Sequence, residues 1–264
     1  MSASSLALHR IGVQRTSRAW ALAGIALIVL AWQFAASRLG PLLMTTPLET
    51  LAALIALVQR ADFQRHAGTS LLRIALGAGG GCLIGLLLGL AAGASARLRG
   101  LLEPLRWLLM AVPPVIVVVL AMLWFGLGTE MVVFMAMLML APGMYVNTVK
   151  GMQAVDRQLA EMTHVYRFTL FQRLRHLYLP TLAAPLTAAL LIATCGSVRL
   201  VVMAEVLGAA DGAGFALANA RSTFDSGELY AWTLLTLLLV GVLELALLQP
   251  LQRRLARWQE QVDA

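Results

Sequence analysis

A few charged side chains stand inside or beside long apolar runs of this sequence. Arg73 begins one run, and Glu244 interrupts the last one. Charged groups are costly within a membrane, so a functional role is the default interpretation of such residues. For these two we favour the structural alternative, which is pairing with another apolar helix or snorkelling to an interface. A proton relay would need more carboxylates along one path than these runs contain.

Arg199 and Glu205 lie six residues apart in another apolar run. This spacing is about 1.7 helical turns, so the two side chains are not neighbours on one helix face, and Glu205 is expected near the outer surface. An anionic solute would fit Arg199, whereas the negative charge of Glu205 means that this pair would not attract an anion along the whole pathway. With Trp124 and Phe125 they are our predicted pathway or gate residues. For the aromatic pair, an interfacial belt is at least as good an interpretation.

Motifs for enzymatic chemistry do not occur in the sequence. It has no Walker A pattern, no HExxH, no GxSxG and no pair of aspartates inside the apolar runs. Cys82 and Cys195 have neither a disulfide pattern nor a metal-ligand spacing. We therefore expect no enzyme activity, no cofactor and no metal.

The formal net charge of +7 does not indicate nucleic-acid binding, because the cations border apolar runs and form no basic face.

The composition indicates an all-α membrane protein. Hydrophobic residues make up 60% of the chain and charged residues 12%, and the mean hydropathy is +0.81, whereas soluble domains carry about 25% charge. A membrane span needs ~20 apolar residues. Six spans are predicted: Ala19–Ser37, Ile74–Ala96, Trp107–Thr129, Met131–Val149, Leu177–Val198, and Leu229–Leu243 with a continuation to Gln252. The first is longer than a signal-peptide core, so a retained anchor is favoured.

The distribution of Lys and Arg predicts the orientation. These residues concentrate in the N-terminal tail, in the connections between spans two and three and between spans four and five, and in the C-terminal tail. Because cytoplasmic loops carry the excess of cations, both termini are predicted to be cytoplasmic. Thr46-Pro47 can begin a helix over Leu48–Gln59 that is amphipathic but too short to span. We expect it to lie externally against the membrane.

Glycines recur every fourth residue in the second predicted span. The set is Gly77, Gly81, Gly85, Gly89 and Gly93. This spacing places bare backbone on one helix face, so a neighbouring helix can approach closely. A phosphate-binding loop is excluded, because no strand precedes the glycines and no Gly-Lys-Ser/Thr follows.

A basic, helix-like segment, residues 156–180, separates the fourth and fifth spans and reads DRQLAEMTHVYRFTLFQRLRHLYLP. Asp156 is a good N-cap for a helix that begins at Arg157. Apolar residues recur about every three positions, at Leu159, Met162, Val165, Phe168, Phe171, Leu174 and Leu177. Periodicity alone is equally consistent with docking into another protein and with a helix resting on the inner leaflet.

This segment resembles the cytoplasmic signature of the membrane subunits of binding-protein-dependent ABC importers. The signature is Glu-Ala-Ala, three residues, Gly, nine residues, Ile, one residue, Leu-Pro. Here Glu161-Met162-Thr163, Arg167, Leu177 and Leu179-Pro180 have this spacing without a gap. Glu161, Leu179 and Pro180 match in identity, and the other four depart. Arg167 is the serious departure, because the glycine in its place permits a sharp turn between two short helices. A continuous or differently bent coupling segment is the expected consequence.

Further stretches resemble the nitrate/sulfonate/taurine class of these permeases. They are SLLRIALG from residue 70, PPVIVVVLAMLWFGLGTE from residue 113, and AEVLGAADGAGFALANARSTFD from residue 204. The resemblance covers most of the chain. It implies a type I importer permease with a methionine-importer-like transmembrane fold, located as a multi-pass protein in the bacterial inner membrane.

The resemblance also implies partners and a division of the chain. Residues 1–18 and 253–264 are expected to be cytoplasmic tails, 19–68 the first span and the external helix, and 69–252 the permease core. A second permease copy, two ABC ATPase subunits and a periplasmic or lipid-anchored solute-binding protein complete the importer, in membrane lipid. The ATPase-contacting residues are Glu161, Met162, Val165, Arg167, Phe168, Phe171, Arg173, Leu179 and Pro180.

The implied solute is small, an organic or inorganic anion such as a sulfonate, taurine or nitrate. Two alternatives remain open from the sequence. One is a secondary transporter or channel without an ATPase partner, which would need coupling charges in its spans. The other is a membrane scaffold whose segment 156–180 binds a soluble protein.

Overall fold

The computed structural model describes residues 3–40 and 43–245, and all regular elements in these ranges are helical. The first half contains α1 (Ala3–Leu39), α2 (Pro47–Val58), α3 (Phe63–Ala94), α4 (Ala96–Ala111), α5 (Pro114–Phe125) and α6 (Thr129–Gln153). The second half contains α7 (Arg157–Val165), α8 (Leu170–Arg173), a π-helical turn (Leu174–Tyr178), α9 (Leu179–Gly208), α10 (Ala213–Ser222) and α11 (Ser226–Leu243). The predicted continuation of the last span to Gln252, and the tail 253–264, lie outside the described residues.

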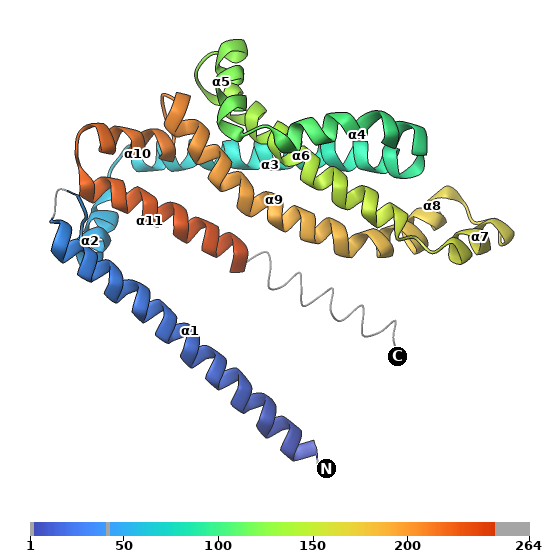
Figure 1. Cartoon of the computed structure of the whole chain (residues 1–264), viewed down its shortest axis with the longest axis horizontal. Coiled ribbons are helices and arrows are strands. Elements are labelled where there is room, and N and C mark those ends of the chain that lie inside the picture. Colours follow the sequence, from blue (N-terminus) through green and yellow to red (C-terminus); the bar gives the residue numbers. More distant parts are fainter. Residues whose placement is uncertain (1–2, 41–42, 246–264) are drawn as a thin grey trace.

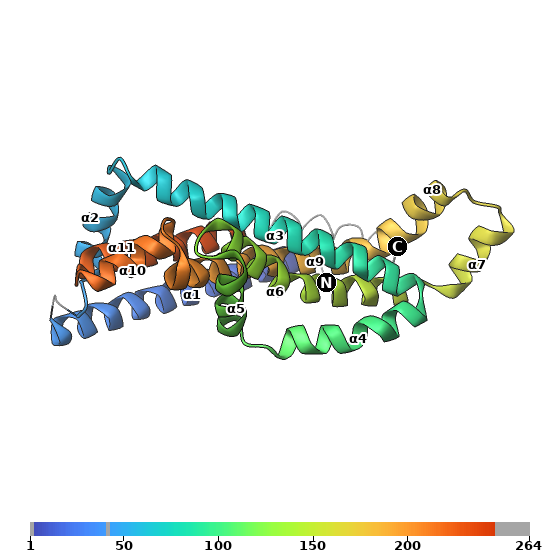
Figure 2. The same ribbon diagram turned by 90° about the horizontal axis from the view of Figure 1, so that it is seen from above.

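Helices α3, α6 and α9 run side by side and form the body of the molecule (Figures 1 and 2). At one end of this body lie α2 and α10, and at the opposite end lie α7 and α8. Helix α1 runs apart from the body and approaches it near α2. There Trp32 donates a hydrogen bond to the Thr45 carbonyl (3.0 Å) and stacks on Tyr230 of α11.

Five helices of the described chain are long and apolar enough to cross a membrane, and the number is six if α4 and α5 together form one span. The third predicted span, Trp107–Thr129, is not one straight helix, because the chain bends by 101° between these two helices. Val112 at the bend is extended, with φ −73° and ψ 126°. Pro113 and Pro114 cause this, since proline lacks an N–H donor and disfavours helical backbone in the residue before it.

The glycines of α3 lie against α6 of the same chain. A Cβ atom on Gly85 would come within 2.4 Å of the Ala141 carbonyl oxygen, and one on Gly89 within 2.5 Å of the Thr148 Cβ. Contacts this short leave no room for a methyl group. The prediction that the glycine face admits a neighbouring helix is therefore confirmed, and the neighbour is α6.

The predicted short helix after the first span is present as α2. The Thr46 hydroxyl accepts from the Glu49 N–H, and the Glu49 carboxylate accepts from the Thr46 N–H, a reciprocal capping box with Pro47 at the first helical position. The hydrogen bonds from Thr46 lower the pKa of the Glu49 carboxyl below its usual value. Leu54 and Leu57 then pack with Trp232 of α11 in a small core of their own.

Candidate functional site

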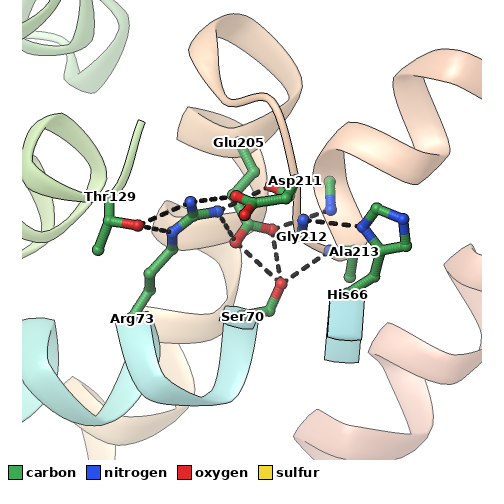
Figure 3. A network of polar contacts seen from close by, with 9 residues as sticks. His66, Ser70, Arg73, Thr129, Glu205, Asp211, Gly212 and Ala213 are labelled. Carbon is green, nitrogen blue, oxygen red and sulfur yellow. Dashed lines mark hydrogen bonds and ion pairs between the residues drawn. The ribbon is translucent and has the colours of Figure 1, made fainter. Parts of the chain in front are cut away.

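The most elaborate polar site lies where α3, α6, α9 and α10 meet, and Figure 3 shows its side chains. We call it the Arg73 network, made of His66, Ser70, Arg73, Thr129, Glu205 and Asp211. The three α3 members follow a spacing of four and three residues, which places them on one helix face. Thr129 begins α6, Glu205 belongs to the last turn of α9, and Asp211 precedes α10.

Arg73 is the centre of the network and is 1% exposed. Its Nη1 donates to Glu205 Oε1 at 2.9 Å and to the Asp211 carbonyl at 2.8 Å. Its Nη2 donates to Asp211 Oδ1 at 2.5 Å and to Thr129 Oγ1 at 2.9 Å, and Nε donates to the same Thr129 oxygen at 3.2 Å. A guanidinium has five N–H groups, so every one of them has an acceptor.

The Glu205 carboxylate is equally well satisfied. Ser70 Oγ lies 2.9 and 2.8 Å from its two oxygens, and the Gly214 N–H donates to Oε2 at 2.9 Å. The Ser70 hydroxyl in turn accepts from the Ala213 N–H at 2.7 Å. These N–H groups belong to the start of α10, where the helix dipole favours a negative charge. A buried ion pair with all its hydrogen bonds made holds its geometry strongly.

The loop before α10 and the first turn of α10 each require a glycine. Gly212 has φ +105°, and a Cβ on it would come within 2.4 Å of the Glu205 carboxylate. A Cβ on Gly214 would come within 2.4 Å of the Val202 carbonyl oxygen. His66 supports this loop, because its Nδ1 accepts from the Gly212 N–H at 3.1 Å and its ring stacks on Phe215.

The structure separates Arg199 from Glu205. Glu205 is buried in the Arg73 network, whereas Arg199 is exposed and lines a cavity of about 510 Å³. Glu244, at the end of α11, lines the same cavity. The interpretation of Arg73 as a paired charge is confirmed. The sequence did not identify three further members of the network, Ser70, Thr129 and Asp211. The Asp-Gly-Ala-Gly stretch from residue 211 was the available signal for the loop.

Trp124 and Phe125 end α5 and pack on Phe134 of α6, with ring centroids 6.0 and 4.8 Å apart. Both remain exposed on the other side. Their predicted place in the pathway or gate stays a prediction, as does that of Arg199 and Glu205.

The segment 156–180 forms two short helices rather than one. Asp156 accepts from the Gln158 N–H at 2.8 Å, which confirms its predicted capping role. After α7, Arg167 adopts the left-handed conformation with φ +50°, and the Phe168 N–H donates to the Thr163 carbonyl at 2.9 Å. This bond, from the second residue past the C-cap Tyr166, is that of a Schellman motif. Of the two expected forms, a continuous or a differently bent segment, the structure therefore has the bent one.

The next helix begins with its own cap. Thr169 accepts from the Gln172 N–H at 3.3 Å, and the Gln172 side chain accepts from the Thr169 N–H at 2.9 Å, a reciprocal box. These local bonds hold the turn although Arg167 occupies the position that favours glycine. The left-handed conformation costs a residue with a Cβ about 1–2 kcal/mol.

The apolar residues of the segment differ in exposure, and several exposed ones, Leu159, Met162 and Tyr166, line the same cavity as the buried ones. Leu177 is buried and Phe168 is partly buried, and both line a cavity of about 140 Å³ between α7 and the π-helical turn. Most of the others point to solvent in this single chain. The exposed apolar side chains are Leu159, Met162, Val165, Tyr166, Phe171 and Leu179. They lie at the α7–α8 end of the molecule (Figure 1).

The sequence profile of the family described as binding-protein-dependent transport system inner membrane component matches residues 81–260. The chain belongs to this family. It is an inner-membrane permease component of a binding-protein-dependent transport system, as the resemblance of segment 156–180 implied.

Curated relatives are permease proteins of similar length. The aliphatic sulfonates permease SsuC of Bacillus subtilis is 26% identical over 90% of this chain and 87% of its own. The taurine permease TauC of Escherichia coli is 26% identical over 90% and 88% of the two chains. The formylaminopyrimidine permease ThiX of Halalkalibacterium halodurans is 25% identical over 89% and 93%.

The fold is similar to that of a solved structure. A chain of the MetNI methionine ABC transporter, in an inward-facing conformation, superposes with a TM-score of 0.63 at 18% identity. The match covers 72% of this permease and 94% of that chain. The expected methionine-importer-like fold is thereby confirmed.

Proposed function

We propose that this permease forms the solute pathway of an ATP-driven importer and that segment 156–180 docks on an ABC ATPase. The observation that carries the proposal is the row of exposed apolar side chains on α7 and α8, at one end of a bundle of membrane helices. Val165 is 78% and Phe171 is 68% exposed. Apolar helix faces of this kind are what a groove on a partner protein buries.

The turn at Arg167 suits a coupling role. It fixes the angle between α7 and α8 by backbone hydrogen bonds, so a displacement of the docked helices is transmitted as one unit to α9. Glu161 is exposed on α7 and is available for an ion pair with the ATPase. Closure of two ATPases on binding ATP would then pull the segment and switch the pore between its inward-open and outward-open states.

We further propose an orientation in the membrane, a second copy and a class of solute. The α7–α8 end and both termini face the cytoplasm, and the α2–α10 end faces the side on which a solute-binding protein delivers its cargo. A second permease copy completes the pore. Relatives named for sulfonates and taurine favour a small anionic or zwitterionic solute.

Affinity purification from native membranes tests the proposal. A chain with Val165→Asp and Phe171→Asp should insert normally but recover at least about tenfold less ATPase, because two carboxylates would be buried in an apolar groove. Leu48→Asp is the matched control, since Leu48 is 78% exposed on α2 at the opposite end of the molecule. Undiminished ATPase recovery by the double variant would contradict docking through this segment.

The partner recovered with the unaltered chain decides between the proposal and its alternatives. A subunit with a Walker A motif supports the importer. Recovery of the permease alone, under conditions that keep membrane complexes intact, would favour a secondary transporter, a channel or a scaffold.

A further inference from the structure

The short connection between α10 and α11 holds an aromatic side chain in an unusual position. Phe224 is 81% exposed, and its backbone is left-handed with φ +57°. This conformation is strained for a residue with a Cβ, and a bulky side chain adopts it rarely. Exposing the apolar ring to water is a second cost. Neither the backbone of the turn nor burial of apolar surface within the chain therefore accounts for phenylalanine at this position.

The turn around Phe224 is a complete Schellman motif at the end of α10. The Phe224 N–H donates to the Arg221 carbonyl at 3.3 Å, and the Asp225 N–H donates to the Ala220 carbonyl at 2.9 Å. Glycine is the usual residue at the left-handed position of this motif. Asp225 then caps α11, because its Oδ1 accepts from the Glu228 N–H at 2.9 Å. Hydrogen bonds on both sides therefore fix the backbone that carries the ring.

One other non-glycine residue of the described chain has a positive φ. It is Arg167, which occupies the same left-handed position in the Schellman motif after α7. Both residues are exposed, and the helices that they follow, α7 and α10, lie at opposite ends of the molecule (Figure 1). Strained backbone of this kind clusters at functional sites. Since the turn at Arg167 belongs to the segment proposed to bind the ATPase, Phe224 indicates a second contact site at the other end.

The surroundings of Phe224 indicate what kind of surface it contacts. Its four nearest residues in the chain are all exposed, and two of them are charged: Arg221, Ser222, Thr223 and Asp225. Lipid does not solvate charged groups, and aromatic belts at a membrane surface consist of Trp and Tyr, which have a polar atom that Phe lacks. An exposed aromatic ring among polar and charged groups is instead typical of an anchor in a protein interface. The contact is therefore expected to be a protein in water.

We propose that Phe224 anchors the solute-binding protein on which this family of transport systems depends. The ring would enter an apolar pocket on the binding protein, while Arg221 and Asp225 pair with charges of opposite sign around that pocket. A ring held in place before the partner arrives loses little freedom on binding, which favours affinity. The connection between α10 and α11 lies at the α2–α10 end (Figure 1). This role rests on the proposed function, because it requires that this end faces the binding protein.

A photo-cross-linker at the position of the ring identifies the partner. Phe224→p-benzoylphenylalanine keeps an aromatic side chain there, and in illuminated cells it should cross-link to a soluble or lipid-anchored protein outside the membrane. That protein, purified alone, should be stabilised by a small solute in a thermal-shift screen. The same replacement at Val165, which is 78% exposed at the opposite end, should reach the ATPase instead. Cross-links from position 224 only to lipid or to a second permease copy would overturn the proposal.

Substitutions at the turn separate docking from folding. Glycine adopts φ +57° without strain, so Phe224→Gly should leave the thermal stability of the permease unchanged or higher. The cross-linked protein should nevertheless bind the complete complex in nanodiscs at least about tenfold more weakly, because the anchor is lost. Phe224→Tyr keeps the ring and should keep most of the affinity. Leu48→Ala, which shortens a side chain 78% exposed at the same end, should change the affinity by less than about twofold.

Two results of these measurements would contradict the anchor role. Unchanged affinity in Phe224→Gly would place the ring outside the interface. A loss of thermal stability in Phe224→Gly, but not in Phe224→Tyr, would show that the ring packs within the permease or on its second copy. Recovery of the ATPase is scored on the same membranes, so its absence from the unaltered complex counts against the proposed function, whereas unchanged docking by Phe224→Gly counts only against Phe224.

Discussion

Arg73 and Glu205 form a buried ion pair at the α10 end of the molecule, whereas Arg199 and Glu244 share an open cavity beside the middle of α9. Both sets combine an arginine and a glutamate from different helices. In the first, every guanidinium N–H and both carboxylate oxygens have partners from four elements. In the second, the described residues supply no ion pair at all.

The difference indicates different roles. A charge surrounded by fixed partners is already solvated by the protein, so it holds helices together and has no capacity left for a ligand. A charge that faces a cavity is available to whatever enters it. The same residue types therefore separate into a structural site and a candidate pathway site by the number of their partners.

The largest effect is expected from Glu205→Ala. Removing the carboxylate leaves Arg73 buried without its ion-pair partner, which costs about 3–5 kcal/mol in the free energy of unfolding. Thermal unfolding of the purified permease in detergent measures it. The double variant Arg73→Met with Glu205→Met should recover part of the loss, because it buries no unpaired guanidinium. Stability equal to that of the unaltered chain in the single variant would contradict the structural role.

A smaller loss is expected from Gly212→Ala. The new methyl group would collide with the Glu205 carboxylate, and the backbone at φ +105° is strained for alanine. We expect a loss of about 1–3 kcal/mol in the same unfolding measurement. Gly79→Ala is the matched control, since a Cβ there meets nothing within 4 Å. An equal response of the two variants would show that the loop before α10 tolerates movement.

A loss of about 1 kcal/mol is expected from His66→Leu, because the Gly212 N–H then loses its acceptor. Combining it with Gly212→Ala sharpens the test, since both changes act on the same loop. Their losses should not be additive. Additive losses in the double variant would place His66 outside the network.

The smallest effect is expected from Glu244→Ala. Its side chain faces the cavity and has no ion-pair partner in the described chain, so the free energy of unfolding should change by less than about 0.5 kcal/mol. Solute uptake by the reconstituted importer should fall all the same. A loss of stability as large as that of Glu205→Ala would erase the distinction between the two sites.

Local features of the chain were readable from the sequence. Asp156 and Thr46 were recognised as helix starts because a cap acts on backbone groups two or three residues away. The glycine repeat of α3 predicted a close helix contact for the same reason, since its spacing is set by the helix itself. The two prolines at residues 113 and 114 indicate a kink, but the size of the bend was not readable, because sequence does not say whether a membrane helix kinks slightly or turns by 101°.

The site depended on contacts between distant parts of the chain. Arg73 and Glu205 are 132 residues apart, and nothing in their local sequence names the partner. Arg167 left both a continuous and a differently bent segment open. The Schellman bond and the Thr169–Gln172 cap stabilise a turn there despite the strain of a left-handed arginine.

The sequence by itself therefore determined that this is a helical membrane protein with a basic, helix-forming segment between its fourth and fifth predicted spans, because hydropathy, charge and capping act over a few residues. The resemblance of that segment to a known signature added the permease family. Only the tertiary structure decided which charged side chains have hydrogen-bond and ion-pair partners and which ones face a cavity. Glu205 pairs with Arg73, whereas Arg199 lines a cavity together with Glu244. The physical reason is that burial of a charge is decided by all the elements that surround it, and these come together only when the chain folds.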